Sequence, residues 1–309
     1  MNHEARVREI LSWYPALTAQ QKENLLRIIN YGRIKGSGYF VILPVDQGFE
    51  HGPGRSFEPN PPGYNPLYHI KLAIEGGCNA YAAPLGAIEA GIDEIKKHQL
   101  PVILKVNSHD LMMPDSQDPF PAVSSWIEDA VRLDCEAVGF TIYPGSSHAR
   151  EMYHQLRNLV ADARKAGLIV VVWAYPRGSG LPSKEAETAL DVVAYAVHIA
   201  CQLGAHIIKC KPPSALISLP ENVKRNLYSQ CLENLSTRVK AVLEAAFSGR
   251  RIVIFSGGEK KATHEILEEV RELKKGGAFG SIVGRNAFQR PFKEGVELLH
   301  EIEDIYLEG

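Results

Sequence analysis

The chain has 309 residues, of which 45% are hydrophobic and 23% charged, and its formal net charge is −2 at pH 7. This composition is typical of a globular domain in water, and the small charge gives no indication of a nucleic-acid partner. No apolar stretch approaches the ~20 residues that a membrane span requires, and the first residues lack the apolar core of a signal peptide. We therefore expect a cytoplasmic protein that binds neither nucleic acid nor membranes.

Residues 1–35 carry apolar side chains at helical spacing in two places, first at Val7, Ile10, Leu11 and Tyr14 and again from Leu25 to Ile29. We predict an N-terminal helical extension that packs against the rest of the fold or against a neighbouring subunit. Nothing in this segment indicates chemistry.

From residue 36 to 309, short strands rich in Val and Ile alternate with amphipathic helices. Strands that are apolar on both faces and joined through helices predict a parallel sheet, and eight such units predict a closed (β/α)8 TIM barrel. An open doubly wound sheet is the alternative, but the G-x-G-x-x-G turn typical of it is absent from the sequence. The predicted strands are Tyr39–Asp46, Ala80–Pro84, Val102–Asn107, Ala137–Tyr143, Ile169–Tyr175, His206–Lys211, Ile252–Ser256 and Gly280–Arg285, and the predicted helices are Pro66–Glu75, Ile88–His98, Val123–Leu133, His148–Ala166, Lys184–Leu203, Asn222–Phe247, Thr263–Lys275 and Phe292–Ile305.

Lys209 lies within an otherwise apolar run, Ala205–Cys210, which is typical of a buried strand. Burying an ammonium group costs several kcal/mol unless it is paired or loses its proton. A neutral lysine is a nucleophile that forms a Schiff base with a carbonyl substrate, whereas the simpler interpretation is a side chain that extends to water. The strand alone does not decide between them.

Polar residues stand at the carboxyl ends of most predicted strands, where barrel enzymes place their chemistry. Side chains two positions apart on a strand share a face, so Trp173, Tyr175 and Arg177 point the same way, as do Lys209 and Lys211. We expect repulsion between those two ammonium groups to lower the pKa of one of them. The polar strand ends are Asp46-Gln47, Lys105-Val106-Asn107, Thr141-Ile142-Tyr143, Trp173–Arg177, Lys209–Lys211, Ser256-Gly257-Gly258 and Gly284-Arg285-Asn286.

The last two strand ends predict what the substrate carries. Barrels often bind phosphate with the loops after strands seven and eight. Gly257 and Gly258 allow backbone N–H groups to approach an anion, and Arg285 adds a permanent positive charge. We therefore predict a phosphorylated substrate.

From about Gly38 onward, the motifs resemble those of the archaeal-type class I fructose-bisphosphate aldolases, a family that includes the DhnA-like bacterial enzymes. The resemblance implies a Schiff-base role for Lys209, proton transfer by Tyr175, and orientation of the imine by Asp46. It also implies that the enzyme needs no metal or other cofactor. The motifs are Pro44–Gly52, Leu104–Asn107, Val138–Ser146, Val172–Gly178, Ile208-Lys209, Ser256–Gly258 and Val283–Asn286, and the substrate-binding residues that they imply are Trp173, Arg177, His51, Lys105, Lys211, Ser256, Gly257, Gly258, Gly284 and Arg285.

The resemblance implies reversible cleavage of fructose 1,6-bisphosphate and, by family analogy, a homo-oligomer such as a decamer. One departure is Lys211-Pro212-Pro213, where the family often has an aromatic residue and a glycine. This departure keeps open a Schiff-base enzyme for another phosphorylated ketose, such as a heptulosonate synthase or an autoinducer-processing enzyme. Two further alternatives are a binding protein without activity and a metal-dependent aldolase. Residues available to a metal are His51, His69, His98, His109 and Asp110, but no H-x-x-x-H spacing occurs.

Overall fold

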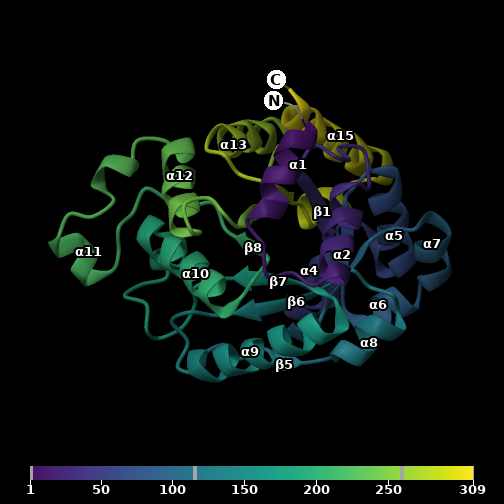
Figure 1. Cartoon of the computed structure of the whole chain (residues 1–309), viewed down its shortest axis with the longest axis horizontal. Coiled ribbons are helices and arrows are strands. Elements are labelled where there is room, and N and C mark those ends of the chain that lie inside the picture. The colour runs from purple at the N-terminus through teal and green to yellow at the C-terminus, as the bar shows by residue number, and fades with distance from the viewer. Residues whose placement is uncertain (1–2, 114–116, 258–260, 309) are drawn as a thin grey trace.

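The computed structural model describes residues 3–113, 117–257 and 261–308, and it contains the predicted barrel. Eight parallel strands close in the order β1-β10-β9-β8-β7-β6-β3-β2, with helices between them (Figure 1). The prediction of a (β/α)8 barrel is therefore confirmed, and each predicted strand is present. The barrel strands are β1 (Phe40–Pro44), β2 (Ala80–Ala83), β3 (Val102–Lys105), β6 (Ala137–Ile142), β7 (Ile169–Ala174), β8 (Ile207–Cys210), β9 (Ile252–Ser256) and β10 (Gly280–Ile282).

The helices around the barrel follow the amphipathic segments, and two of them have the predicted bounds. Asn65 accepts a hydrogen bond from the N–H of Leu67 and so caps the first turn of α5. Gly167 and Gly204 end α9 and α10 in the left-handed conformation that favours glycine. The longer helices are α5 (Pro66–Glu75), α7 (Ile92–His98), α8 (Ile127–Arg132), α9 (Ala149–Ala166), α10 (Leu190–Leu203), α12 (Leu235–Ala245), α13 (Thr263–Lys275) and α15 (Phe292–Leu307).

The largest error in the predicted elements is the single helix Asn222–Phe247. The structure has a short α11 (Pro220–Lys224), then a segment that contains the 3-10 helix η3 (Ser229–Cys231), then α12. Asn226 takes a left-handed conformation with φ 54°, and Asn234 caps α12 by accepting from the N–H of Thr237. Asparagine tolerates both positions better than most residues. Because apolar residues keep helical spacing across this segment, the sequence pattern did not show that the helix is interrupted at Asn226 and that a new helix begins after Asn234.

Other departures are short elements in the loops. Asn107–Ser108 (β4) pairs antiparallel with Ala122–Val123 (β5), so the predicted helix from Val123 begins only at Ile127. The predicted helix Ile88–His98 is two helices that meet at Gly91. The remaining short elements are α3 (Gln47–Glu50), α4 (Pro53–Phe57), η1 (Pro61–Tyr64), α6 (Leu85–Glu89), η2 (Glu185–Thr188), η3 (Ser229–Cys231) and α14 (Arg285–Phe288).

The N-terminal extension forms α1 (His3–Ser12) and α2 (Ala19–Ile29), which lie over the amino-terminal end of the barrel (Figure 1). Gln21 and Asn24 donate hydrogen bonds to the carbonyl groups of Leu168 and Gly167, where β7 begins. Arg27 pairs with the buried carboxylate of Glu136 at 2.8 Å. These contacts attach the extension to the barrel end opposite the predicted active site. Within the described ranges, no helix is long and apolar enough to cross a membrane.

Glu303 on α15 buries a carboxyl group whose oxygens have no hydrogen-bond partner among the described residues. Burial raises the pKa of Glu303 to about 8, although the charge of Arg33, 3.9 Å away, opposes the shift. Because this pKa lies above the value in the unfolded chain, the stability that it contributes at low pH is lost as the pH rises toward 8. We expect the free energy of unfolding to fall between pH 5 and pH 9.

In the Glu303→Gln variant, that fall should shrink by roughly 2–4 kcal/mol, measured by urea unfolding at both pH values. Glu301→Gln, an exposed position on the same helix, is the matched control and should keep the wild-type pH dependence. An unchanged fall in the Glu303→Gln variant would contradict the assignment.

Candidate active site

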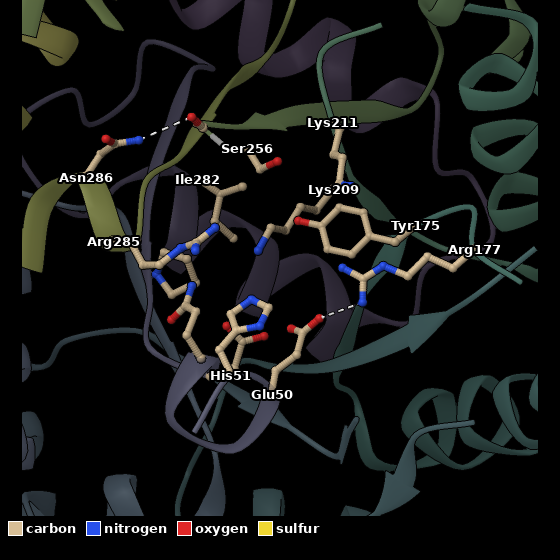
Figure 2. A pocket seen from close by; sticks show the side chains of 15 residues that line it. Glu50, His51, Tyr175, Arg177, Lys209, Lys211, Ser256, Ile282, Arg285 and Asn286 are labelled. Carbon is tan, nitrogen blue, oxygen red and sulfur yellow. Dashed lines mark hydrogen bonds and ion pairs between the residues drawn. The ribbon is translucent and has the colours of Figure 1, made fainter. Parts of the chain in front are cut away.

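A cavity of about 560 Å³, open to solvent, lies at the carboxyl ends of the barrel strands (Figure 2). Residues from at least five strand ends meet there, as the sequence predicted. The predicted residues that line it are Asp46, His51, Tyr175, Arg177, Lys209, Lys211, Ser256, Gly257, Gly284 and Arg285, and the cavity also contacts Pro44, Gln47, Glu50, Ile282 and Asn286.

Lys209 lies on β8, and its amine points into the cavity (Figure 2). The residue is only 4% exposed, so its side chain does not extend to bulk water. Its Nζ lies 4.9 Å from the centroid of the Trp173 ring and 5.5 Å from that of Tyr175. Two aromatic rings therefore lie beside an amine that has little contact with solvent. A solvent-poor apolar pocket is a suitable setting for a nucleophilic lysine.

Tyr175 follows the last residue of β7 and presents its phenol beside Lys209 (Figure 2). Burial raises the pKa of Tyr175, and the charge of Lys209 and a hydrogen bond with Ser256 reduce that rise. The phenol is therefore protonated at neutral pH and able to donate a proton. Asp46, 3% exposed at the end of β1, lines the same cavity.

Lys105 and Trp173 do not line the cavity but lie beneath it, each 1% exposed. The ammonium group of Lys105 donates to the backbone carbonyl and to the Oδ1 of Asn107. Its Nζ also lies 5.4 Å from the centroid of the Trp173 ring, whose other neighbour is Lys209. Burial lowers the pKa of Lys105 to about 8, the charges of Asp46 and Glu50 oppose this, and repulsion by Lys209 adds to it.

Gly139 on β6 leaves space for the side chains of Trp173 and Lys105. A Cβ atom at this position would lie 2.6 Å from Cζ3 of Trp173 and 3.3 Å from Cδ of Lys105. Gly139→Ala should therefore displace the indole ring that supports the amine of Lys209, and we expect roughly 1–3 kcal/mol of destabilisation from overpacking. We also expect kcat to fall by about 10²-fold, since small displacements near reacting groups cost this much.

Urea unfolding and steady-state kinetics on the Gly139→Ala variant check both effects. Gly86→Ala, where a Cβ atom would have no neighbour within 4 Å, is the matched control. Wild-type kinetics in the Gly139→Ala variant would show that the position of the indole ring is unimportant.

Lys211 also lines the cavity, but its charge is paired. Its Nζ lies 3.3 Å from Oε2 of Glu187, whose Oε1 binds Lys184 at 2.6 Å. Burial and then the charge of Arg177 lower the pKa of Lys211. The expectation of repulsion between Lys209 and Lys211 was therefore wrong in its cause, and Lys105 is the lysine that Lys209 affects. No motif or spacing indicates Glu187, which lies in the short 3-10 helix η2.

Glu50 lines the cavity, although the motif pattern did not single it out as a site residue within Pro44–Gly52. Its Oε1 accepts hydrogen bonds from Nη1 of Arg177 at 3.3 Å and from the hydroxyl of Tyr143 at 3.4 Å. Burial raises the pKa of Glu50, but the charges of Arg177, His51, Lys105 and Lys209 outweigh this and the net shift is downward. An ionised Glu50 thus holds Arg177 at the rim (Figure 2).

The two glycine-containing loops come together as predicted. Asn286 connects them, because its Nδ2 donates to the carbonyl of Gly257 at 3.2 Å (Figure 2). Gly284 allows close contact with β1, since a Cβ atom there would lie 2.9 Å from the carbonyl oxygen of Pro44. Arg285 projects into the cavity from the start of α14. Gly258, also predicted to bind substrate, lies outside the described residues.

Comparison with known proteins agrees with this geometry. The family model of the DeoC/LacD family aldolases matches residues 40–290, which include every barrel strand in full. The chain belongs to this aldolase family. Most of the barrel, and the whole of the cavity, thus lies within the matched region of the aldolase.

Individual aldolases extend the comparison and confirm the resemblance to the archaeal-type class I enzymes. A probable fructose-bisphosphate aldolase class 1 of Chlamydia muridarum is 35% identical over 301 residues, covering 92% of this chain and 84% of that protein. The fructose-bisphosphate aldolase class 1 of Thermoproteus tenax is 35% identical over 254 residues, covering 82% of this chain and 84% of that protein.

A solved archaeal fructose-1,6-bisphosphate aldolase, with its catalytic lysine covalently bound to the carbinolamine intermediate of the substrate, superposes with a TM-score of 0.75. The two sequences are 29% identical, and the superposition covers 93% of this chain and 100% of the solved chain. The similarity therefore extends over the whole barrel and not over one motif.

Proposed function

We propose that this aldolase is a class I fructose-bisphosphate aldolase, which cleaves fructose 1,6-bisphosphate reversibly to dihydroxyacetone phosphate and glyceraldehyde 3-phosphate. The observation that carries the proposal is the amine of Lys209, which is buried between two aromatic rings and directed into a cavity at the carboxyl end of the barrel. The solved archaeal relative, in which a catalytic lysine holds the carbinolamine, supports the same chemistry.

In the proposed reaction, neutral Lys209 attacks the C2 ketone, and loss of water from the carbinolamine gives a protonated imine. The imine accepts the electron pair of the breaking C3–C4 bond, and the C4 hydroxyl loses its proton as glyceraldehyde 3-phosphate forms. The resulting enamine is protonated at C3, and hydrolysis releases dihydroxyacetone phosphate and the free amine. Tyr175 and Asp46 share the proton transfers, because both line the cavity beside the amine.

The substrate phosphate is assigned to the loops after β9 and β10, with Ser256, Gly257, Gly258, Gly284 and Arg285 as its ligands. The charge of Arg285 and the backbone of two glycine-containing loops support this assignment. His51, Arg177 and Lys211, which line the same cavity, contact the rest of the sugar. Trp173 and Lys105 act from below, by supporting the amine of Lys209.

A substrate panel tests the assignment. Purified protein is assayed with fructose 1,6-bisphosphate, fructose 1-phosphate and other phosphorylated ketoses, with and without excess EDTA. We expect fructose 1,6-bisphosphate to give the highest kcat/KM and EDTA to have no effect. Preference for another phosphorylated ketose would favour the alternative Schiff-base enzymes, and loss of activity in EDTA would favour a metal-dependent one. Binding without turnover would indicate a non-catalytic protein.

The proposal also includes a cytoplasmic location and a homo-oligomer. We specifically expect the decamer that the family resemblance implies. Sedimentation velocity of the purified chain measures the assembly. A monomer at micromolar concentration would refute that part of the proposal without affecting the activity.

A further inference from the structure

A second cavity, of about 810 Å³ and open to solvent, lies at the end of the barrel opposite to the amine of Lys209. It forms where the loop between α1 and α2 passes the residues that precede β8 and β9. Trp13, Tyr14 and Leu17 of that loop, together with Val160 of α9, provide apolar walls. The N-terminal extension thus creates a concave surface that the barrel alone would not have.

The charged residues of this cavity are all cationic. Arg164 of α9 and Arg251, just before β9, line it, and none of the lining residues is an Asp or Glu. Among the described residues, no carboxylate forms an ion pair with either arginine. Their charge is therefore available to a ligand.

Arg251 is held in place. Its guanidinium carbon lies 4.9 Å from the centroid of the Tyr14 ring and 5.0 Å from that of Phe247. Its Nη1 donates to the carbonyl oxygens of Trp13 and Arg250, at 3.2 and 2.7 Å. Because these contacts fix the group before any ligand arrives, binding an anion there costs little side-chain entropy.

His206 supplies a neutral donor beside the two arginines. Its Nδ1 accepts a hydrogen bond from the N–H of Val170 at 2.9 Å, so the proton of the neutral ring is on Nε2. Burial, followed by the charges of Arg251 and Arg164, lowers the pKa of His206 to about 4, which keeps the ring neutral. The hydroxyl of Tyr14 is already occupied, donating to the carbonyl of His206 and accepting from the N–H of Ile252. The side chains that remain available are thus hydrogen-bond donors.

We propose that this cavity is a binding site for a small organic carboxylate with a flat apolar body, separate from the sugar-phosphate cavity. The carboxylate is bound by Arg164 and Arg251, whose planar guanidinium groups match its geometry, with His206 as a further donor. The apolar body packs against Trp13, Leu17 and Val160. Charged groups in a cavity with mainly apolar walls are the usual arrangement of a small-molecule site.

The probe is 1-naphthoate, and its neutral analogue 1-naphthamide is the control ligand. Isothermal titration of the full-length protein should show naphthoate binding with a dissociation constant at least tenfold lower than that of naphthamide. Arg164→Gln should weaken naphthoate binding at least fivefold, and Arg164→Glu should abolish it. Lys165→Gln, the same charge change at the next position of α9, should leave it unchanged, because Lys165 pairs with Asp162 outside the cavity.

Arg285→Gln distinguishes this cavity from the active site. Naphthoate binding that persists in this variant and is lost in Arg164→Glu supports the proposal. Equal affinity for naphthoate and naphthamide, binding unaffected by Arg164→Glu, or binding lost in Arg285→Gln would each refute it. Arg164 is exposed on α9, so its variants are not expected to affect folding, and thermal unfolding checks this.

Discussion

Lys209→Met is expected to lower kcat/KM for cleavage of fructose 1,6-bisphosphate by roughly 10⁴-fold or more, because it removes the nucleophile itself. Methionine retains the length and apolar stem of the side chain. The variant should therefore fold as well as the wild type. Steady-state kinetics and thermal unfolding measure the two effects.

Borohydride reduction in the presence of dihydroxyacetone phosphate identifies the reacting amine. The triose should attach to Lys209 in the wild type and to no lysine in Lys209→Met, as shown by peptide mass spectrometry. Lys211→Met and Lys105→Met are the matched controls, because each removes a neighbouring amine and leaves Lys209 in place. An adduct on Lys105 or Lys211 would show that the nucleophile is misassigned.

The barrel and most of the cavity could be predicted from the sequence because their signals are local. A strand such as Ile169–Ala174 is apolar on both faces, and the polar residue that follows it reaches the cavity by topology alone. Once the strands close into a barrel, Asp46, Tyr175 and Arg285 must meet at one end although they are far apart in the chain. Periodicity and fold rules were sufficient for that step.

The residues that the sequence did not reveal depend on contacts between loops. Glu187 enters the site because η2 places it against Lys211, and no periodic pattern indicates that placement. For a similar reason, the sequence did not show that the amine of Lys105 lies beneath the cavity. Its position at a strand end predicted a cavity residue, but Asn107 holds the amine beneath the cavity. The positions of these two side chains depend on the residues that they bind, and the spacing of residues in the sequence does not show those partners.

The second cavity, which we propose binds a carboxylate, could not be predicted from the sequence either. The apolar spacing in residues 1–35 predicts helices that pack on something, but it does not show that the loop between them leaves space beside Arg164 and Arg251. That arrangement requires three segments to meet, and the whole of α10 and of α12 lies between the two arginines in the chain. It could be found only in the folded molecule.

Tyr175→Phe is expected to lower kcat by roughly 10²–10⁴-fold, the usual contribution of a positioned acid or base. The substitution removes one oxygen and retains the ring that packs 5.5 Å from the amine of Lys209. Because burial raises the pKa of Tyr175, the phenol enters the reaction as the acid and can protonate the leaving hydroxyl of the carbinolamine. The variant should therefore still be labelled by dihydroxyacetone phosphate and borohydride, but more slowly than the wild type.

A matched control makes the test of Tyr175 specific. Tyr195→Phe removes the hydroxyl of an exposed tyrosine on α10 and should leave kcat unchanged. A Tyr175→Phe variant that keeps more than about a tenth of wild-type kcat would fall outside the range for an acid–base residue, and Asp46 would then be the group that transfers the proton.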